Sequence, residues 1–147
     1  MEPVRIVDLE AAPTAVVRAT TTWDAFPALW PSLLDEVWAV VRGGGVAAGR
    51  NVMLYTGEAP DVEVGVELLG PFAPAGRVVA STLPTGRAAQ VVVRRPVTAA
   101  SLGAGHDAVV RFCDEHGHRR SGVRMEVYGH VGADGDVQDT TISWLLG

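Results

Sequence analysis

Apolar residues recur with a helical period in two stretches of the chain. In the first stretch they fall at positions i, i+4, i+7, i+11 and i+15, which places on one helix face Phe26, Trp30, Leu33, Val37 and Val41. A weaker stripe with the same period consists of Leu102, His106, Val109 and Cys113. Thr22 or Asp24 can cap the first helix, and glycine follows both stripes, at 43–45 and at 117. The pattern predicts one long helix in each half of the chain.

Strand-like runs flank both predicted helices. Short runs rich in β-branched residues come before the helices, within 5–18 and 77–94. Alternating apolar and polar runs come after them, within 51–68 and 123–145. Each half of the chain therefore follows the plan β-β-α-β-β.

The two halves read as an internal duplication. Repeat one covers about residues 3–70 and repeat two about 75–147. The Gly- and Pro-rich linker at 70–76 is too short to separate independent domains, so we expect a single domain over residues 1–147. The predicted fold class is α+β, with antiparallel sheets that are each covered by one long helix and with a cleft between the repeats.

Alternation along the strands assigns the polar side chains to faces. In the strand at 61–68 the valines share the face that a helix would cover, which leaves Glu63 on the other face. We also place Met53, Tyr55, Glu126 and Tyr128 on the face away from the helix, with the valine between the last two in the core. If the two repeats pack side by side, these faces meet around the expected cleft.

Composition and charge narrow the class of protein. The 147 residues are 48% apolar and 20% charged, which suits a globular domain with its own core. All 12 basic residues are arginines, yet the net charge of −5 argues against a nucleic-acid surface and mildly favours a cationic ligand. No apolar stretch is long enough to span a membrane, and the amino-terminal residues lack the pattern of an export signal. With a single cysteine, Cys113, the sequence predicts a cytoplasmic protein without a membrane partner.

Familiar catalytic and cofactor motifs are absent or weak. The chain has no dinucleotide-binding glycine fingerprint, no phosphate-binding loop and no Gly-x-Ser-x-Gly elbow. His116 and His118 lie in a predicted turn without the further ligands that a zinc site needs. Cys113 lies on an apolar helical stripe and reads as a buried thiol. We therefore expect neither a metal nor a cofactor.

The order and spacing of these elements resemble the GyrI-like small-molecule-binding domain, which also serves as the effector-binding part of AraC- and MerR-type regulators. The resemblance covers nearly the whole chain and depends on residues 22–26, 61–66 and 126–128. It implies a cleft between the repeats that takes bulky, amphipathic and often cationic compounds. It also implies that Glu126 is the buried glutamate facing the ligand and that Trp23 is an aromatic residue lining the cleft.

Three departures from the family pattern bear on the ligand more than on the fold. Residues 95–97 read Arg-Pro-Val where second repeats often carry Gly-Pro-Tyr, so one aromatic wall is missing. Met125 stands where a tryptophan often precedes the glutamate, and Thr141 stands where the last strand often has an acidic residue.

The candidate ligand-binding residues are Glu126, Tyr128, Tyr55, Trp23, Glu63 and Met53. A carboxylate among apolar and aromatic groups favours a cation, because the cation offsets the cost of burying the charge. The aromatic rings can sandwich a flat ligand or make cation–π contacts. A simpler interpretation also stays open, in which Glu126 is exposed on a sheet face and the aromatic residues serve packing alone.

Three functional hypotheses follow from the residues and the resemblance. The first is a protein that binds a bulky amphipathic cation for sequestration, sensing or resistance. The second is a hydrolase that opens strained, cyclopropane-bearing genotoxins, as some free-standing relatives do. In it Glu126 would act as the acid or base or would orient water, with Tyr128 or Tyr55 assisting. The third is a protein inhibitor of a larger enzyme such as a topoisomerase.

Overall fold

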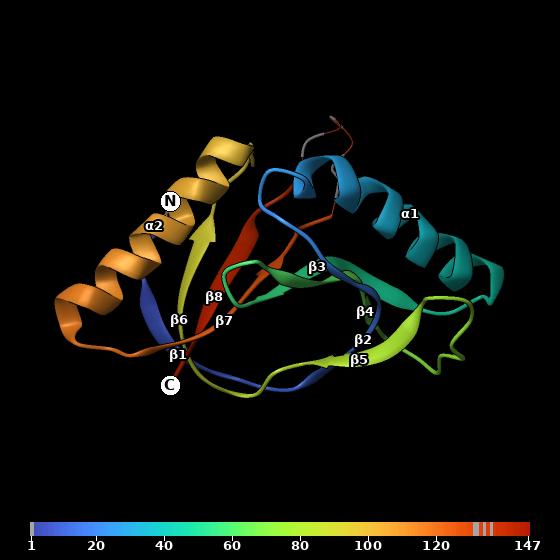
Figure 1. Ribbon diagram of the computed structural model, residues 1–147, viewed down its shortest axis with the longest axis horizontal. Coiled ribbons are helices and arrows are strands. Elements are labelled where there is room, and N and C mark those ends of the chain that lie inside the picture. Colours follow the sequence, from blue (N-terminus) through green and yellow to red (C-terminus); the bar gives the residue numbers. More distant parts are fainter. Residues whose placement is uncertain (1, 131–132, 134, 136) are drawn as a thin grey trace. The chain divides into compact units, whose positions relative to one another are not determined.

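The computed structural model describes residues 2–130, 133, 135 and 137–147, and these residues form two compact units. One unit is Glu10–Pro84, and the other combines Met1–Leu9 with Thr85–Gly147. Within the described residues each unit contains four antiparallel strands and one helix (Figure 1). The predicted α+β class with one long helix on each sheet is therefore confirmed.

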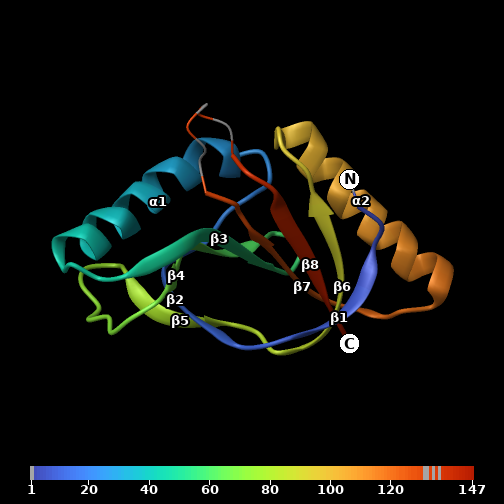
Figure 2. The same cartoon turned by 180° about the vertical axis from the view of Figure 1, so that it is seen from behind.

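The unit Glu10–Pro84 has the strand order β3-β4-β2-β5. Its elements are β2 (Ala12–Thr20), α1 (Phe26–Gly43), β3 (Ala48–Thr56), β4 (Asp61–Leu68) and β5 (Val79–Leu83). Figure 2 shows α1 on one side of these strands, where it contacts β2 and β4. The predicted stripe faces the sheet, since α1 buries Phe26, Leu33, Val37 and Val41. Ahead of the helix, the Thr22 hydroxyl accepts a hydrogen bond from the Ala25 N–H at 3.1 Å.

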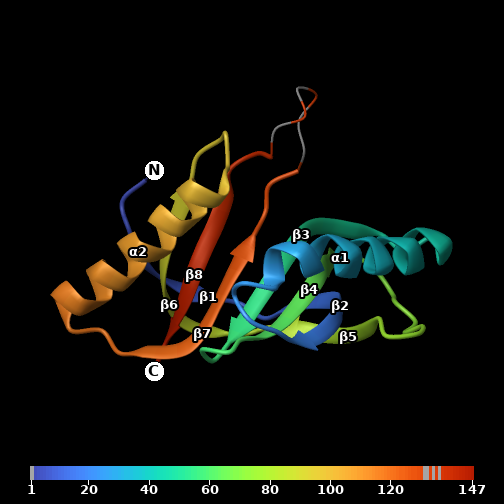
Figure 3. The same cartoon turned by 45° about the horizontal axis from the view of Figure 1, so that its top comes forward.

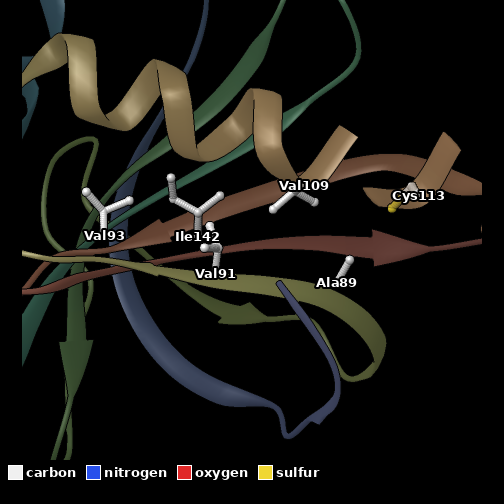
Figure 4. Close-up of a cluster of buried hydrophobic side chains, with 6 residues drawn as sticks. All are labelled: Ala89, Val91, Val93, Val109, Cys113 and Ile142. Atoms are coloured by element: carbon white, nitrogen blue, oxygen red, sulfur yellow. The ribbon is translucent and has the colours of Figure 1, made fainter. Parts of the chain in front are cut away.

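The second unit has the strand order β1-β6-β8-β7. Its elements are β1 (Arg5–Leu9), β6 (Gly86–Val93), α2 (Ala99–His116), β7 (Arg120–Val127) and β8 (Thr140–Leu146). Thr98 caps α2 by accepting from the Ser101 N–H at 3.1 Å, and Gly117 ends it in the left-handed conformation. Figure 3 shows α2 along β6 and β8, and Figure 4 shows the core between them, formed by Ala89, Val91, Val93, Val109, Cys113 and Ile142.

The strand pairing does not follow the order of the sequence repeats. β1, the first strand of repeat one, pairs with β6 in repeat two, whereas β5, the first strand of repeat two, pairs with β2 in repeat one. Each unit therefore contains the first strand of the other repeat. A two-residue hairpin between β1 and β2, or between β5 and β6, needs residues with positive φ. Among the described residues only glycines have positive φ, and the two connections, Glu10-Ala11 and Pro84-Thr85, contain none. The chain therefore continues out of β1 and β5 without folding back.

The register in the first unit fixes which side chains face α1. Directly opposed residues of an antiparallel pair project from the same side of the sheet. Tyr55 is opposite Val62 and Met53 is opposite Val64, and the ring centroid of Tyr55 is 5.6 Å from that of Phe26 on α1. The expectation that Met53 and Tyr55 lie on the face away from the helix is wrong, because these pairings place them with the valines beneath α1.

The register in the second unit corrects the placement of Glu126 in the same way. Glu126 is opposite Ile142, a member of the core beneath α2. Val127 is opposite Thr141, on the other face of the sheet. Glu126 therefore faces α2. The expectation that Val127 lies in the core and Glu126 on the face away from the helix is wrong.

Candidate functional site

Glu126 is a buried carboxylate held between the sheet and the helix of its unit. Its residue is 5% exposed, so the interpretation as a solvent-exposed glutamate is excluded. The Oε2 atom lies 2.7 Å from Nε2 of His106 on α2, and Oε1 accepts a hydrogen bond from the hydroxyl of Tyr128. Both partners are ring side chains. The imidazole belongs to α2, and the phenol belongs to the residue directly after β7.

His106 uses both ring nitrogens, and this fixes its protonation. The indole N–H of Trp144 donates to Nδ1 of His106 at 3.0 Å. Because an indole nitrogen can only donate, Nδ1 must be the acceptor and carries no proton. The single ring proton is then on Nε2, where it is donated to Glu126. His106 is thus neutral in this arrangement, and its contact with Glu126 is a hydrogen bond that adds no positive charge.

The close approach of α2 to the sheet lets His106 reach these partners. A Cβ atom on Gly105 would lie 2.7 Å from Cδ1 of Ile142 and 2.8 Å from Cγ2 of Val93, nearer than real Cβ contacts allow. Only a glycine at this position fits the observed spacing between helix and sheet. The neighbouring imidazole therefore comes within hydrogen-bond distance of both β7 and β8.

Arginines surround the indole that orients His106. The guanidinium of Arg124 lies 5.4 Å from the ring centroid of Trp144 and donates to the carbonyl of Gly122 at 2.9 Å. The guanidinium of Arg120 lies 5.9 Å from the same ring. Trp144 is opposite both Arg124 and Ala89, on the α2 face. The face that carries Glu126 thus also holds a nearly buried guanidinium.

A second cluster of candidate residues lies in the other unit, at the start of α1. The ring centroids of Trp23 and Tyr55 are 5.3 Å apart, and Phe26 completes the cluster at 6.4 Å from Trp23. Tyr55 is buried and donates from its hydroxyl to Sδ of Met53 at 3.3 Å. Trp23 is 48% exposed. The cluster therefore presents an accessible indole on a buried aromatic base, which suits contact with a flat or cationic ligand.

Glu63 belongs to a different surface. Its carboxylate accepts from Nε of Arg18 at 3.1 Å and from the hydroxyl of Ser81 at 2.6 Å, on the face of β4 opposite α1. An open pocket of about 320 Å³ adjoins it, lined by Arg18, Ala19, Thr20, Leu54, Thr56, Asp61, Val62 and Glu63. The structure does not bring Glu63 together with Tyr55 and Met53, since these face α1.

Cys113 and His116, the other residues that the sequence analysis considered for chemistry, are packed against their neighbours in the fold. Cys113 is fully buried, and this burial raises the pKa of its thiol. The imidazole of His116 stacks on Phe112, with ring centroids 4.3 Å apart. No group of three potential metal ligands occurs in the described part of the chain. None of its described helices is long and apolar enough to cross a membrane.

Sequence reasoning missed His106 and Trp144 as partners of Glu126. From the sequence, His106 is placed only in the helical stripe of α2, and no motif singles out Trp144. A usable signal exists, because a histidine on an apolar helix stripe must satisfy two ring nitrogens after burial. What the sequence lacks is the register that places Glu126 and Trp144 on the same face beneath the helix.

Comparison with known proteins supports the fold. No family model matches the chain, and no curated protein matches it by sequence. The crystal structure of the EcmrR C-terminal domain matches with a TM-score of 0.75 and 15% identity, over 98% of this chain and 96% of that one. In a complex of EcmrR with DNA, with the same TM-score of 0.75 and 15% identity, the match covers 97% of this chain but 56% of the longer EcmrR chain.

Two further structures match over nearly the full length. SAV2435, solved bound to tetraphenylphosphonium, has a TM-score of 0.65 and 10% identity, over 100% of this chain and 94% of that one. A hydrolase encoded by lin2189 from Listeria innocua has a TM-score of 0.61 and 10% identity, over 99% and 92%. Likeness at such identities concerns the fold. The chain therefore has the fold of the EcmrR C-terminal domain and of SAV2435, which agrees with the fold that the resemblance to the GyrI-like domain implies.

Proposed function

We propose that this chain binds a bulky, amphipathic organic cation and that Glu126 supplies the counter-charge. One observation carries the proposal: a carboxylate that is 5% exposed accepts hydrogen bonds from a neutral imidazole and a neutral phenol. These bonds stabilise the charged carboxylate without neutralising it. An arriving cation offsets the remaining cost of burying the charge, which a neutral ligand does not.

Aromatic side chains supply the apolar part of the proposed site. Tyr128 touches the carboxylate itself, and the half-exposed indole of Trp23 is backed by Tyr55. A cation over one such ring gains about 0.5–2 kcal/mol. SAV2435, which shares the fold, was solved with a tetraphenyl-substituted cation, and this supports the choice of ligand class. That the two clusters contact one ligand, in the cleft expected from the sequence, stays a prediction.

The test compares two probes of the same shape and opposite charge. Tetraphenylphosphonium and tetraphenylborate differ mainly in the sign of the central charge, so the ratio of their dissociation constants isolates electrostatics from apolar contact. We expect the wild-type chain to bind the phosphonium at least about tenfold more tightly, about 1.4 kcal/mol. Isothermal titration calorimetry gives both constants, and quenching of tryptophan fluorescence provides a second measurement.

Glu126→Gln removes the charge and keeps the shape, so the preference for the cation should disappear. Glu63→Gln is the matched control, because Glu63 also projects from a strand, but its carboxylate accepts from Arg18 and Ser81 on the face of β4 away from α1. The control should keep the wild-type ratio. A Glu126→Gln variant that still prefers the phosphonium tenfold would show that the proposed role of this carboxylate is wrong.

Hydrolysis is the second candidate, and the contact between Tyr128 and Glu126 favours it. A carboxylate bonded to a phenol and an imidazole is a competent acid–base group, and a hydrolase from Listeria innocua shares the fold. Catalytic amounts of protein should then open a strained cyclopropane electrophile through many turnovers. Mass spectrometry would detect the ring-opened product. Tyr128→Phe should slow turnover more than it weakens binding. Protection limited to one equivalent, with no product, would count against hydrolysis.

A further inference from the structure

A continuous chain of hydrogen bonds crosses the second unit from β8 to β7. The indole of Trp144 donates to Nδ1 of His106, and Nε2 of His106 donates to Oε2 of Glu126. The hydroxyl of Tyr128 donates to the other carboxylate oxygen. His106 and Tyr128 both donate to Glu126 as neutral groups.

Trp144 determines which form of His106 fits this chain. An imidazolium would carry a proton on Nδ1, directed at the indole N–H only 3.0 Å away, so two donors would face each other. The Nδ1–H neutral tautomer meets the same obstacle and leaves Nε2 without a proton to give Glu126. Only the Nε2–H tautomer satisfies both contacts.

We infer that His106 is a specificity-determining residue of the Glu126 site: locked by Trp144 as a neutral donor, it keeps Glu126 charged and thereby selects cationic over anionic ligands. The inference depends on the proposed function, since it concerns the same carboxylate. It goes further by assigning the charge preference to a helix residue and its tautomer. His106 is here a positioning residue, because it acts through Glu126.

Three substitutions separate two properties of His106. The first is that it donates a hydrogen bond to Glu126, and the second is that it carries no charge. His106→Gln keeps both, since an amide can accept from Trp144 through its oxygen and donate to Glu126 through its nitrogen. His106→Leu has no donor, and a carboxyl that loses a hydrogen bond to its charged form shifts toward the protonated form. His106→Lys keeps a donor and brings a positive charge beside Glu126.

The expected outcomes are ratios of dissociation constants for tetraphenylphosphonium and tetraphenylborate. His106→Gln should stay within about threefold of the wild-type ratio. His106→Leu should lower the preference for the cation by about tenfold or more, the usual effect of losing a hydrogen bond to a charged group. His106→Lys should lower it further, because the introduced cation repels the phosphonium. Melting temperatures show that each variant is folded.

A second measurement needs no ligand. Correlation spectra of ¹⁵N-labelled protein distinguish a protonated from an unprotonated ring nitrogen in histidine. The chain has 4 histidines, and the signal that is lost in His106→Gln identifies His106. The wild-type spectrum should show Nε2 protonated and Nδ1 unprotonated, and Trp144→Phe should relax this pattern toward a mixture of tautomers.

The outcomes distinguish the inference from the proposal beneath it. A wild-type chain that does not prefer the phosphonium overturns both. A wild-type preference that His106→Leu retains in full overturns the inference alone, as does a protonated Nδ1 in the wild-type spectrum. If His106→Gln loses the preference although it folds, the neutral-donor explanation is wrong. The inference stands if His106→Gln and the wild type agree while His106→Leu and His106→Lys do not.

Discussion

Gly105→Ala tests whether the close packing of α2 sustains both the core and the candidate site. The introduced Cβ would lie 2.7 Å from Ile142 and 2.8 Å from Val93, whereas carbon atoms pack best at about 3.5–4.0 Å. Ile142 can rotate its end group, but Val93 is β-branched and stiff. Overpacking of this kind costs about 1–3 kcal/mol. The helix must otherwise move outward by roughly 1 Å to restore normal contacts.

Gly103→Ala in the same helix is the matched control, since a Cβ there meets nothing within 4 Å. Both substitutions gain about 0.8–1 kcal/mol of helix propensity, so the difference between them isolates the packing cost of about 1–3 kcal/mol. Urea unfolding measures it, and the melting temperatures should differ by about 2–4 °C for each kcal/mol.

The same variant should weaken the charge preference of the site. An outward shift of the helix by roughly 1 Å would stretch the 2.7 Å contact between His106 and Glu126 past the upper limit of about 3.2 Å for such a bond. Gly105→Ala should therefore move toward the behaviour of His106→Leu in the two-probe assay. If Gly105→Ala proves as stable as Gly103→Ala and keeps the wild-type ratio, the account of this helix given above is refuted.

Two further predictions concern titratable groups outside the site. Burial raises the pKa of Cys113, so iodoacetamide should label the native protein far more slowly than the urea-unfolded protein, as mass spectrometry would show; equal rates would contradict the assigned burial. The N–H of Arg95 and the guanidinium of Arg94 lower the pKa of Asp139, so its ionised form stabilises the fold above the ordinary carboxyl pKa, and this contribution is lost as pH falls through the lowered value. The melting temperature of the wild type should thus fall more steeply than that of Asp139→Asn on acidification from neutral pH, an effect that added salt should weaken; parallel curves would contradict it.

Local patterns were enough to predict the elements and the fold class. The stripe from Phe26 to Val41 is long and regular, and a helix with one apolar face buries that face against another element, so the existence of α1 and its inward face followed from spacing alone. Alternation within a strand shows which residues share a face but not which face meets the helix. The pairing of Glu126 with Ile142 decides that, and it depends on contacts between distant segments.

Only the part of the candidate site that depends on neighbouring residues could be predicted from the sequence. Glu126 in β7 and Tyr128 directly after β7 are two residues apart, so their shared face followed from the sequence, and their contact agrees with it. His106 lies 20 residues from Glu126 and 38 from Trp144, and no short-range pattern links them. Their meeting depends on how closely the helix packs, which a single glycine controls.

The exchange of first strands affects how the chain assembles during synthesis. Arg5 of β1 pairs with Gln90 of β6, so the first strand must wait for its partner until more than half of the chain has left the ribosome. A waiting strand presents unpaired backbone groups that favour aggregation. β1 is short, and its exposed Arg5 and Asp8 are the kind of charged residues that discourage such pairing. Replacing these two charges with valine should therefore lower the yield of nascent chains that reach the native state, even if the completed protein is as stable as before.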